Sequence, residues 1–216
     1  LVIAIVFHEV AHGYVAKLLG DPTAQERRRL SLNPLRHVDP IGTLVLPGLL
    51  ALFKLPVFGW ARPVPVIKER LRNPRVGMML VAAAGPASNL VLAAVGAVLL
   101  GLLARFLGGG ETAPGLAGFA AQNLINFLMI NVFLALFNLL PIPPFDGSHI
   151  VEGLLPRPLA ARFVQLHRLG FLLVVLLIVV LPGLIPGFDP VGRVVLPPVE
   201  WAIGHYLSLA GLVAGR

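Results

Sequence analysis

Long apolar stretches alternate along the chain with short segments that are polar or rich in glycine and proline. The apolar stretches cover approximately residues 1–19, 76–107, 116–140, 166–181 and 194–213. A helix of about 20 apolar residues is long enough to cross the hydrocarbon core of a bilayer. The pattern therefore predicts an all-α polytopic membrane protein, a helical bundle of about five spans.

The connection between the first two apolar stretches has a different pattern. Within residues 23–35, apolar Leu30 and Leu32 alternate with polar neighbours, which is typical of a short strand. Residues 41–60 are apolar but are interrupted by glycine, proline and one lysine. Broken backbone is tolerated at membrane depth only where it packs against protein or lines a cavity. We therefore expect a small β or re-entrant segment between the first and second spans.

The composition agrees with a membrane location. Hydrophobic residues make up 57% of the 216 residues and charged residues 12%, whereas soluble domains carry about 25% charged residues. Cysteine is absent, so any zinc site must use histidine and carboxylate ligands. The formal net charge of +7 favours contact with anionic membrane lipid over binding of nucleic acid.

The basic residues also predict an orientation. Residues 17–75 contain eleven Lys and Arg but only four Asp and Glu. Because cytoplasmic loops are enriched in Lys and Arg, we expect this segment on the cytoplasmic side of the cell (plasma) membrane. Residues 141–165 then lie on the same side. A re-entrant path for residues 41–60 keeps the basic residues 62–75 there as well.

One motif of ionisable residues lies inside the first apolar stretch. His8, Glu9 and His12 form an H-E-x-x-H sequence. On a helix the two histidines lie about 40° apart, so both imidazoles can bind one metal ion, and Glu9 shares their broad face. The alternative is a solvated polar face, but the apolar flanking residues argue against it. The motif predicts a zinc site in which Glu9 acts as a general base.

A catalytic zinc ion usually has three protein ligands and a water, so a third ligand is needed. Asp146 is the leading candidate, because it follows a proline-rich helix end and precedes Gly147. The predicted topology also brings Asp146 and His12 to the same side of the membrane. The alternative is an Asp-Gly turn at the surface. His149 is open to three interpretations: a partner of a ligand, a rival ligand or a loop residue.

These motifs resemble those of the site-2 protease family of intramembrane zinc metalloproteases, in the compact bacterial and archaeal branch that lacks a PDZ domain. The H-E-x-x-H sequence is similar to the zinc motif of the family, and residues 138–147 (NLLPIPPFDG) are similar to its N-x-x-P-x-x-x-x-D-G motif. Residues 85–89 (GPASN) resemble its G-P-x-x-N element, and residues 30–44 and 59–66 resemble segments of the compact branch. The resemblance covers about residues 1–153.

The resemblance implies that zinc is held by His8, His12 and Asp146 and that Glu9 is the catalytic base. It also implies that Asn138 lies near the site, where its amide contacts the substrate backbone or the oxyanion. The alternative for Asn138 is a hydrogen bond that joins two helices. Asparagine and glycine in residues 85–89 are expected to allow close approach of helices and a kink.

The sequence therefore predicts a zinc metalloendopeptidase that hydrolyses peptide bonds in or near transmembrane helices, with transmembrane proteins or peptides as substrates. We expect residues 1–153 to form the catalytic membrane core and residues 154–216 to add C-terminal transmembrane helices to the same bundle. The alternative is a membrane metal-binding protein or metal transporter without protease activity, which needs no base at Glu9. Family members usually carry sequence before the zinc helix and this chain does not begin with Met, so we expect preceding sequence in the natural protein.

Overall fold

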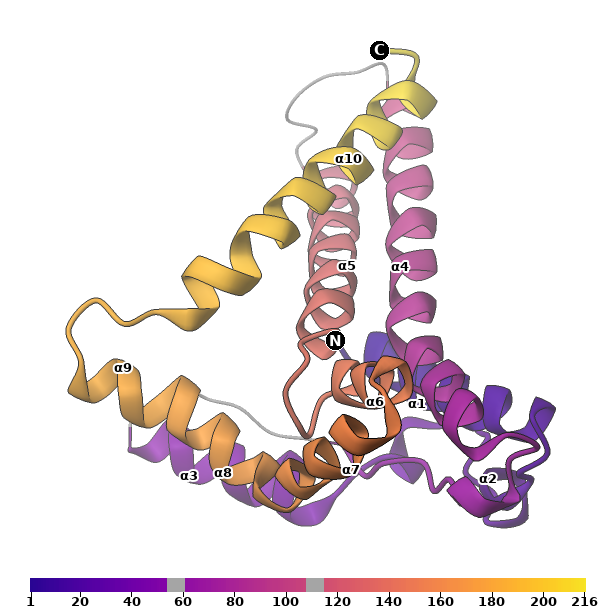
Figure 1. Cartoon of the computed structure of the whole chain (residues 1–216). Helices are drawn as coiled ribbons and strands as arrows, with labels where there is room; N and C mark the ends of the chain where they lie inside the picture. Colours follow the sequence, from indigo (N-terminus) through magenta and orange to yellow (C-terminus); the bar gives the residue numbers. More distant parts are fainter. Residues whose placement is uncertain (54–60, 108–114) are drawn as a thin grey trace.

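Helices make up most of the described part of the chain, residues 1–53, 61–107 and 115–216 of a computed structural model (Figure 1). No strand occurs within these residues, and the all-α prediction is confirmed. The longer helices are α1 (Val2–Leu18), α4 (Pro74–Phe106), α5 (Leu116–Asn138), α6 (Asp146–Leu154), α7 (Arg157–Gln165) and α10 (Leu196–Ala214). The shorter ones are α2 (Thr23–Glu26), η1 (Pro34–Arg36), η2 (Pro40–Val45), α3 (Leu46–Leu52), η3 (Lys68–Arg70), η4 (Leu166–Leu169), α8 (Gly170–Val175), η5 (Leu176–Val180), α9 (Leu181–Leu184) and η6 (Val191–Val195).

Within the described ranges, three helical stretches are long and apolar enough to cross a membrane: Pro74–Phe106, Leu116–Asn138 and Arg157–Leu184. They contain the second, third and fourth predicted spans. The first and fifth predicted spans are helices but are not among the three. With 17 residues, α1 is slightly shorter than a full crossing, and α10 carries two prolines, Glu200 and His205 in its apolar sequence. The predicted count of five spans is therefore not confirmed.

The strand predicted within residues 23–35 is not formed. Arg27, Arg28 and Arg29 donate their backbone N–H groups to carbonyls three to five residues earlier, so these groups are used locally and cannot pair with another strand. The predicted re-entrant segment is helical over Pro40–Leu52, which is too short to cross the bilayer. Its remaining part, residues 54–60, lies outside the described residues, so the re-entrant path stays a prediction.

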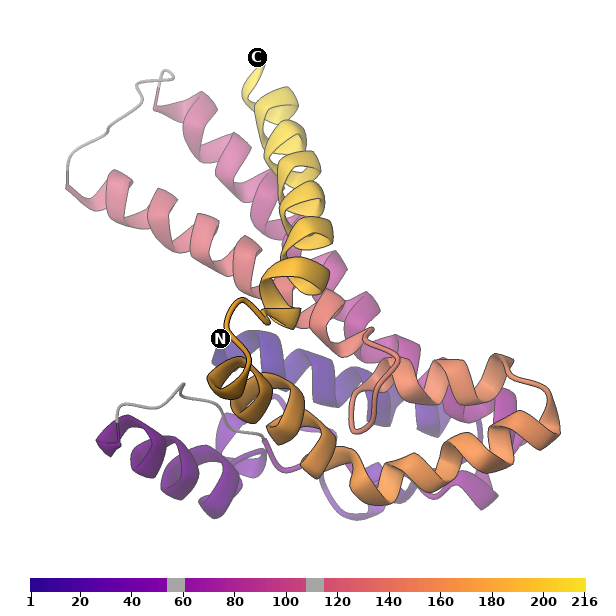
Figure 2. The same cartoon turned by 60° about the vertical axis from the view of Figure 1, so that its left-hand side comes forward.

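The central helix of the fold is α4, because α1, α5, α6 and α10 all pack against it (Figures 1 and 2). Small side chains permit this packing: a Cβ atom on Gly101 would lie 2.4 Å from the carbonyl oxygen of Ala210 in α10. Only 28% of the most apolar 18-residue segment of α4 is buried, and only 22% of the corresponding segment of α5. Much of the outer surface of these two helices is therefore apolar. Exposed apolar faces of this kind are expected for helices that contact lipid. The core that α4, α5, η6 and α10 share contains Ala93, Ala97, Leu128, Val132, Val195, Val199, Ala202 and Ala210.

A buried aspartate joins the end of α1 to residues 61–67, the extended loop before η3. Gly20 follows α1 with a φ of 110°, a left-handed conformation that favours glycine. Asp21 is fully buried and accepts hydrogen bonds from the backbone N–H groups of Thr23 (3.0 Å) and Ile67 (2.6 Å). Burial alone would raise the pKa of Asp21, but these bonds and one from the Thr23 hydroxyl hold it below its usual value. The ionised carboxylate therefore fixes residues 61–67 beside α1.

Candidate metal centre

Three side chains from two helices converge beside α4. His8 and His12 lie one turn apart on α1, and Asp146 begins α6. The Oδ2 atom of Asp146 lies 3.0 Å from His8 Nε2 and 3.3 Å from His12 Nε2. The structure thus brings together the three residues that the sequence predicts as metal ligands.

The Asp-Gly pair does not form the surface turn that was the alternative for Asp146. Both residues belong to the first turn of α6, and Gly147 is buried. A Cβ atom on Gly147 would lie 2.2 Å from the carbonyl oxygen of Leu139. Glycine is therefore needed for the close approach of α6 to the end of α5, and this approach sets the direction of Asp146.

The tautomer of each imidazole follows from the hydrogen bond that its Nδ1 atom makes. His12 Nδ1 lies 2.7 Å from the carbonyl oxygen of Val81, which can only accept, so Nδ1 carries the hydrogen. His8 Nδ1 lies 2.6 Å from Asn89 Oδ1. The amide nitrogen of Asn89 donates to the Ala4 carbonyl (3.1 Å) and to Asn131 Oδ1 (2.9 Å), so its oxygen is an acceptor. His8 Nδ1 is therefore also a donor, and both Nε2 atoms keep a free lone pair.

This arrangement fits a bound metal ion. In neutral histidines of this tautomer, the two Nε2 lone pairs face a carboxylate oxygen, and Asp146 Oδ2 is buried without a hydrogen-bond partner. Three electron-rich atoms so close together repel one another unless a metal cation or an added proton lies between them. Ligands of one tetrahedral zinc ion, at about 2.0–2.1 Å from the metal, lie about 3.3 Å apart. Two imidazoles and a carboxylate are a donor set that suits zinc. Each imidazole is oriented by the hydrogen bond at its Nδ1 atom, and the carboxylate is oriented by its place at the start of α6.

A glycine in α4 makes room for the two histidines. A Cβ atom on Gly85 would lie 2.5 Å from His12 Nε2 and 2.6 Å from His8 Nε2. A Cβ atom essentially never lies this close to a non-bonded atom. A side chain at position 85 is therefore incompatible with the observed positions of the two rings. Gly85 thus gives the metal centre the space it needs between α1 and α4.

The predicted base, Glu9, lies between the two histidines on α1 and is partly buried. Its Oε2 atom accepts a hydrogen bond of 2.8 Å from the backbone N–H of Val64. Val64 is itself buried and packs close to Gly13 of α1. The loop at residues 61–67, anchored by Asp21, therefore orients the carboxylate of Glu9.

Asn138, the second residue predicted to act in catalysis, ends α5, eight residues before Asp146. Its amide nitrogen donates a hydrogen bond of 2.9 Å to the Leu134 carbonyl one turn earlier in the same helix. The bond is local, so it neither joins two helices nor reaches the metal ligands. A role for Asn138 toward a substrate stays a prediction.

The supporting role of α4 was not predicted from the sequence. Residues 85–89 were expected to serve helix packing and a kink, yet Gly85 and Asn89 contact the metal-site histidines directly. The G-P-x-x-N element was the signal that could have revealed them. No sequence signal pointed to the carbonyl of Val81 or to the N–H of Val64, because every residue offers such groups.

Two basic residues, one in η3 and one at the start of α4, hold α6 in place. Arg75 donates hydrogen bonds to the carbonyls of Gly153 (3.0 Å) and Leu155 at the end of α6. Lys68, in η3, forms an ion pair with Glu152 of α6. A helix fixed at its end in this way presents Asp146, at its start, in a constant direction.

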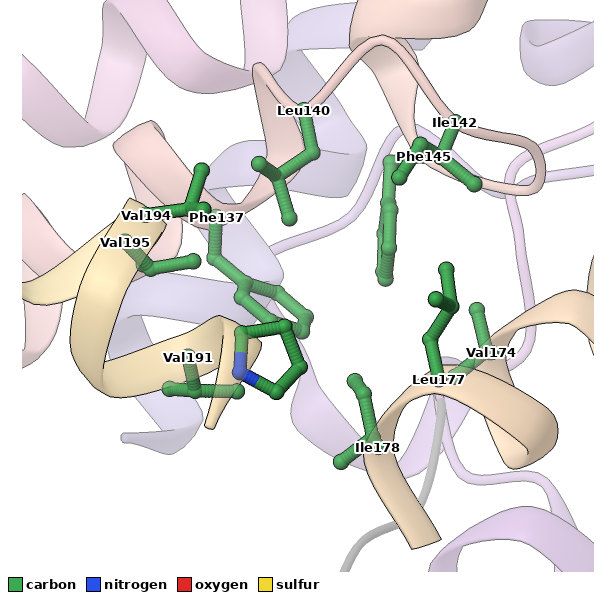
Figure 3. Close-up of a pocket in the computed structure, with 11 residues that line it drawn as sticks. Phe137, Leu140, Ile142, Phe145, Val174, Leu177, Ile178, Val191, Val194 and Val195 are labelled. Atoms are coloured by element: carbon green, nitrogen blue, oxygen red, sulfur yellow. The ribbon is translucent and has the colours of Figure 1, made fainter. Parts of the chain in front are cut away.

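An apolar cavity of about 120 Å³ lies beside the loop that leads to Asp146 (Figure 3). The side chains of Phe137, Phe145 and Leu177 face it in Figure 3, and Val195 contributes from η6. Phe145 lines the cavity, while its neighbour Asp146 faces the histidines. The cavity can therefore accommodate an apolar side chain beside the loop that precedes Asp146.

Comparisons with known proteins identify the family to which the chain belongs. The model of peptidase family M50 matches residues 115–178. The chain is 39% identical over 199 residues to "Putative zinc metalloprotease YwhC" of Bacillus subtilis, a match that covers 92% of this chain and 83% of that relative. It is 32% identical over 176 residues to "Putative zinc metalloprotease Rip2" of Mycolicibacterium smegmatis, covering 82% of this chain and 63% of that relative. No solved structure matches the chain. The chain belongs to peptidase family M50, and the predicted family resemblance is confirmed.

Proposed function

We propose that this chain is an intramembrane zinc metalloprotease that hydrolyses peptide bonds in or near the transmembrane helices of membrane proteins. One observation carries the proposal: two imidazole Nε2 atoms and one carboxylate oxygen converge, while both Nδ1–H groups are bonded elsewhere. Membership of a peptidase family and the names of the relatives as zinc metalloproteases support it.

The proposed chemistry needs one base beside the metal ligands, and Glu9 provides it. When bound, zinc acts as a Lewis acid that polarises a carbonyl group and makes water a stronger acid. The carboxylate of Glu9 accepts a proton from the attacking water as the new C–O bond forms. Glu9 then returns that proton to the peptide nitrogen as the C–N bond breaks. The hydrogen bond from Val64 keeps the carboxylate in one orientation during both transfers.

The proposal places this chemistry inside the membrane. The outer face of α1 exposes apolar side chains such as Val2, Ile3 and Phe7, whereas His8 and His12 face the protein. This division supports α1 as a membrane-embedded helix, in addition to the three apolar stretches. In α10, Trp201 and Leu212 are exposed while Val199 is buried, which supports α10 as a further one. We further propose a plasma-membrane protein whose active site opens toward the cytoplasm, with residues 1–153 as its catalytic core.

The proposed substrates are transmembrane proteins or peptides in contact with membrane lipid. The carbonyl groups of a transmembrane helix are bonded within that helix, so a substrate must unwind locally before attack. The apolar cavity next to Phe145 is suited to an apolar substrate side chain, which supports a membrane-embedded substrate over a soluble one.

The test compares Glu9→Gln with wild type in purified, full-length protein supplied with zinc. The substrates are single-span peptides with a fluorophore and a quencher on either side of the apolar segment. We expect wild type to cleave some of these peptides, and Glu9→Gln to lose activity by about 100-fold or more while keeping its zinc. Glu69→Gln is the matched control, because Glu69 is exposed and should leave the rate unchanged.

The same pair of proteins distinguishes the alternative function. A metal carrier has no need of a base beside its ligands, so Glu9→Gln should transport zinc into liposomes as well as wild type. Equal cleavage by wild type and Glu9→Gln would contradict the proposed role of Glu9. Zinc transport without any peptide cleavage by wild type would contradict the protease function itself.

A further inference from the structure

A second group of potential metal ligands lies outside the centre formed by His8, His12 and Asp146. His149 and Glu152 lie one turn apart on α6, and His167 lies in η4. One donor atom from each of the three lies within 4.8 Å of the others. The rings of His149 and His167 are stacked with their centres 4.8 Å apart. The cluster thus joins α6 to the apolar stretch that follows α7.

The hydrogen bonds around His167 leave one of its nitrogens free to bind a cation. The hydroxyl of Ser148 donates to the Phe145 carbonyl at 2.7 Å. Ser148 Oγ is therefore an acceptor toward His167 Nε2, which lies 3.1 Å away and must carry the hydrogen. His167 Nδ1 then has a lone pair, and it is buried without a hydrogen-bond partner. This is the pattern of a metal-binding histidine, whose other nitrogen donates to a neighbouring group.

The other two residues are also in the form that binds a cation. His149 Nδ1 is buried without a hydrogen-bond partner and lies 3.5 Å from Glu152 Oε2. Burial lowers the pKa of His149 below its ordinary value, which favours the neutral ring. Burial alone would raise the pKa of Glu152, but Lys68 lowers it, so the carboxylate is ionised. Lys68 is bonded to Oε1, which leaves Oε2 facing the two rings.

We infer that His149, Glu152 and His167 form a second binding site for a divalent transition metal, with zinc as the best-suited ion. Two buried nitrogens without partners and one carboxylate oxygen give the same donor set as the first centre, and imidazole with carboxylate suits zinc. Ligands of one zinc ion lie about 3.3 Å apart, so binding would draw the three side chains closer together. The inference is independent of the proposed protease function.

A metal ion at this site would connect α6, which carries Asp146, to the apolar stretch that begins at His167. Asp146 and His149 are separated by less than one turn of α6, so the second site shares a helix with the third ligand of the first. His167 lies shortly before α8. Residues of α8, and of η5 directly after it, line the apolar cavity. A bound ion would therefore fix the start of this apolar stretch against α6.

The experiment counts zinc ions per chain in full-length protein purified in detergent. Each variant is dialysed against buffered micromolar zinc and then measured by elemental analysis. We expect two zinc ions in wild type, one in His149→Ala/His167→Ala and one in His8→Ala/His12→Ala. His205→Ala is the matched control, because His205 is exposed and bonds only to its own helix in the structure, and it should keep two.

Two results would overturn the second site. One is a single zinc ion in wild type together with none in His8→Ala/His12→Ala. The other is an unchanged count in His149→Ala/His167→Ala. Since the paired variant could fail to fold, Glu152→Gln provides a second measurement that preserves side-chain volume. We expect Glu152→Gln to weaken the binding of the second zinc equivalent at least tenfold in a competition titration, with no change in the first.

Discussion

Replacement of Gly85 by alanine should weaken zinc binding without loosening the fold. The added Cβ atom would lie 2.5 Å from His12 Nε2 and 2.6 Å from His8 Nε2. An ordinary contact begins at 3.4 Å, so the methyl group is about 0.9 Å too close to the ring of His12 and about 0.8 Å too close to that of His8. Metal–ligand distances tolerate only about ±0.2 Å, so the rings cannot move aside and still bind one ion.

The size of the effect follows from the cost of the overlap. Adding a methyl group to a close-packed site costs about 1–3 kcal/mol. In the metal-free protein the rings of His8 and His12 need not converge on one ion, so we expect most of this cost to fall on the metal-bound state. At about 1.4 kcal/mol for each factor of ten, the zinc affinity should fall about 5- to 150-fold. Alanine also favours a helix over glycine by up to about 1 kcal/mol, so the metal-free variant should melt at or above the wild-type temperature.

The assay is a competition titration of zinc against a chromophoric chelator, paired with thermal unfolding of the metal-free proteins. Gly96→Ala is the matched control, because Gly96 lies on the same helix and faces Phe127 rather than the histidines. The control should bind zinc as wild type does. Wild-type zinc affinity in Gly85→Ala would contradict the predicted overlap with the two rings. A lower melting temperature of its metal-free form would show that the methyl group disturbs the fold instead.

Three further predictions concern groups that support the site. Asn89→Leu removes the hydrogen bond to His8 Nδ1 and should weaken zinc binding about 10- to 100-fold in the same titration; an unchanged affinity would rule out this orienting role. Gly147→Ala brings a methyl group against the Leu139 carbonyl, so the melting temperature should fall by an amount equivalent to about 1–3 kcal/mol, whereas Gly204→Ala, which meets open space, should not change it. Asp21→Asn should destabilise the protein by about 1–3 kcal/mol at pH 7 through loss of an ionised acceptor. Because the folded pKa of Asp21 is lowered, its contribution is present above the unfolded value of about 3.9 and is lost as the pH falls through the folded value. The difference in melting temperature between wild type and Asp21→Asn should therefore shrink below about pH 4, and a constant difference down to pH 3 would contradict this assignment.

The local part of the metal centre could be predicted because it depends on helix geometry alone. His8 and His12 lie four residues apart in an apolar helix, and that spacing places them on one face wherever the helix packs. Asp146 could be proposed because it follows a proline-rich helix end and precedes Gly147, and because its motif resembles that of the family. The structure shows how α6 carries it to α1. The spacing of residues says nothing about which helix lies behind the histidines, so the roles of Val81 and Asn89 emerged only from the packing.

The strand predicted around Leu30 and Leu32 failed for a related reason. Alternation of apolar and polar residues indicates a strand only when a partner strand is available to accept the backbone hydrogen bonds. Here the preceding backbone N–H groups are used within their own segment, and Asn33 caps the short helix that follows. The number of spans could not be predicted because α1 is marginal in length and α10 is marginal in composition for a membrane crossing.

The three groups of α4 that serve the histidines share one stripe of the helix. Val81, Gly85 and Asn89 follow one another at intervals of four residues, and they supply a carbonyl, a space and an amide. Deleting or inserting one residue between positions 81 and 89 would rotate part of this stripe by about 100°. All relatives that keep this centre should therefore have the same number of residues in that interval, and any differences in length should fall in the loops outside it.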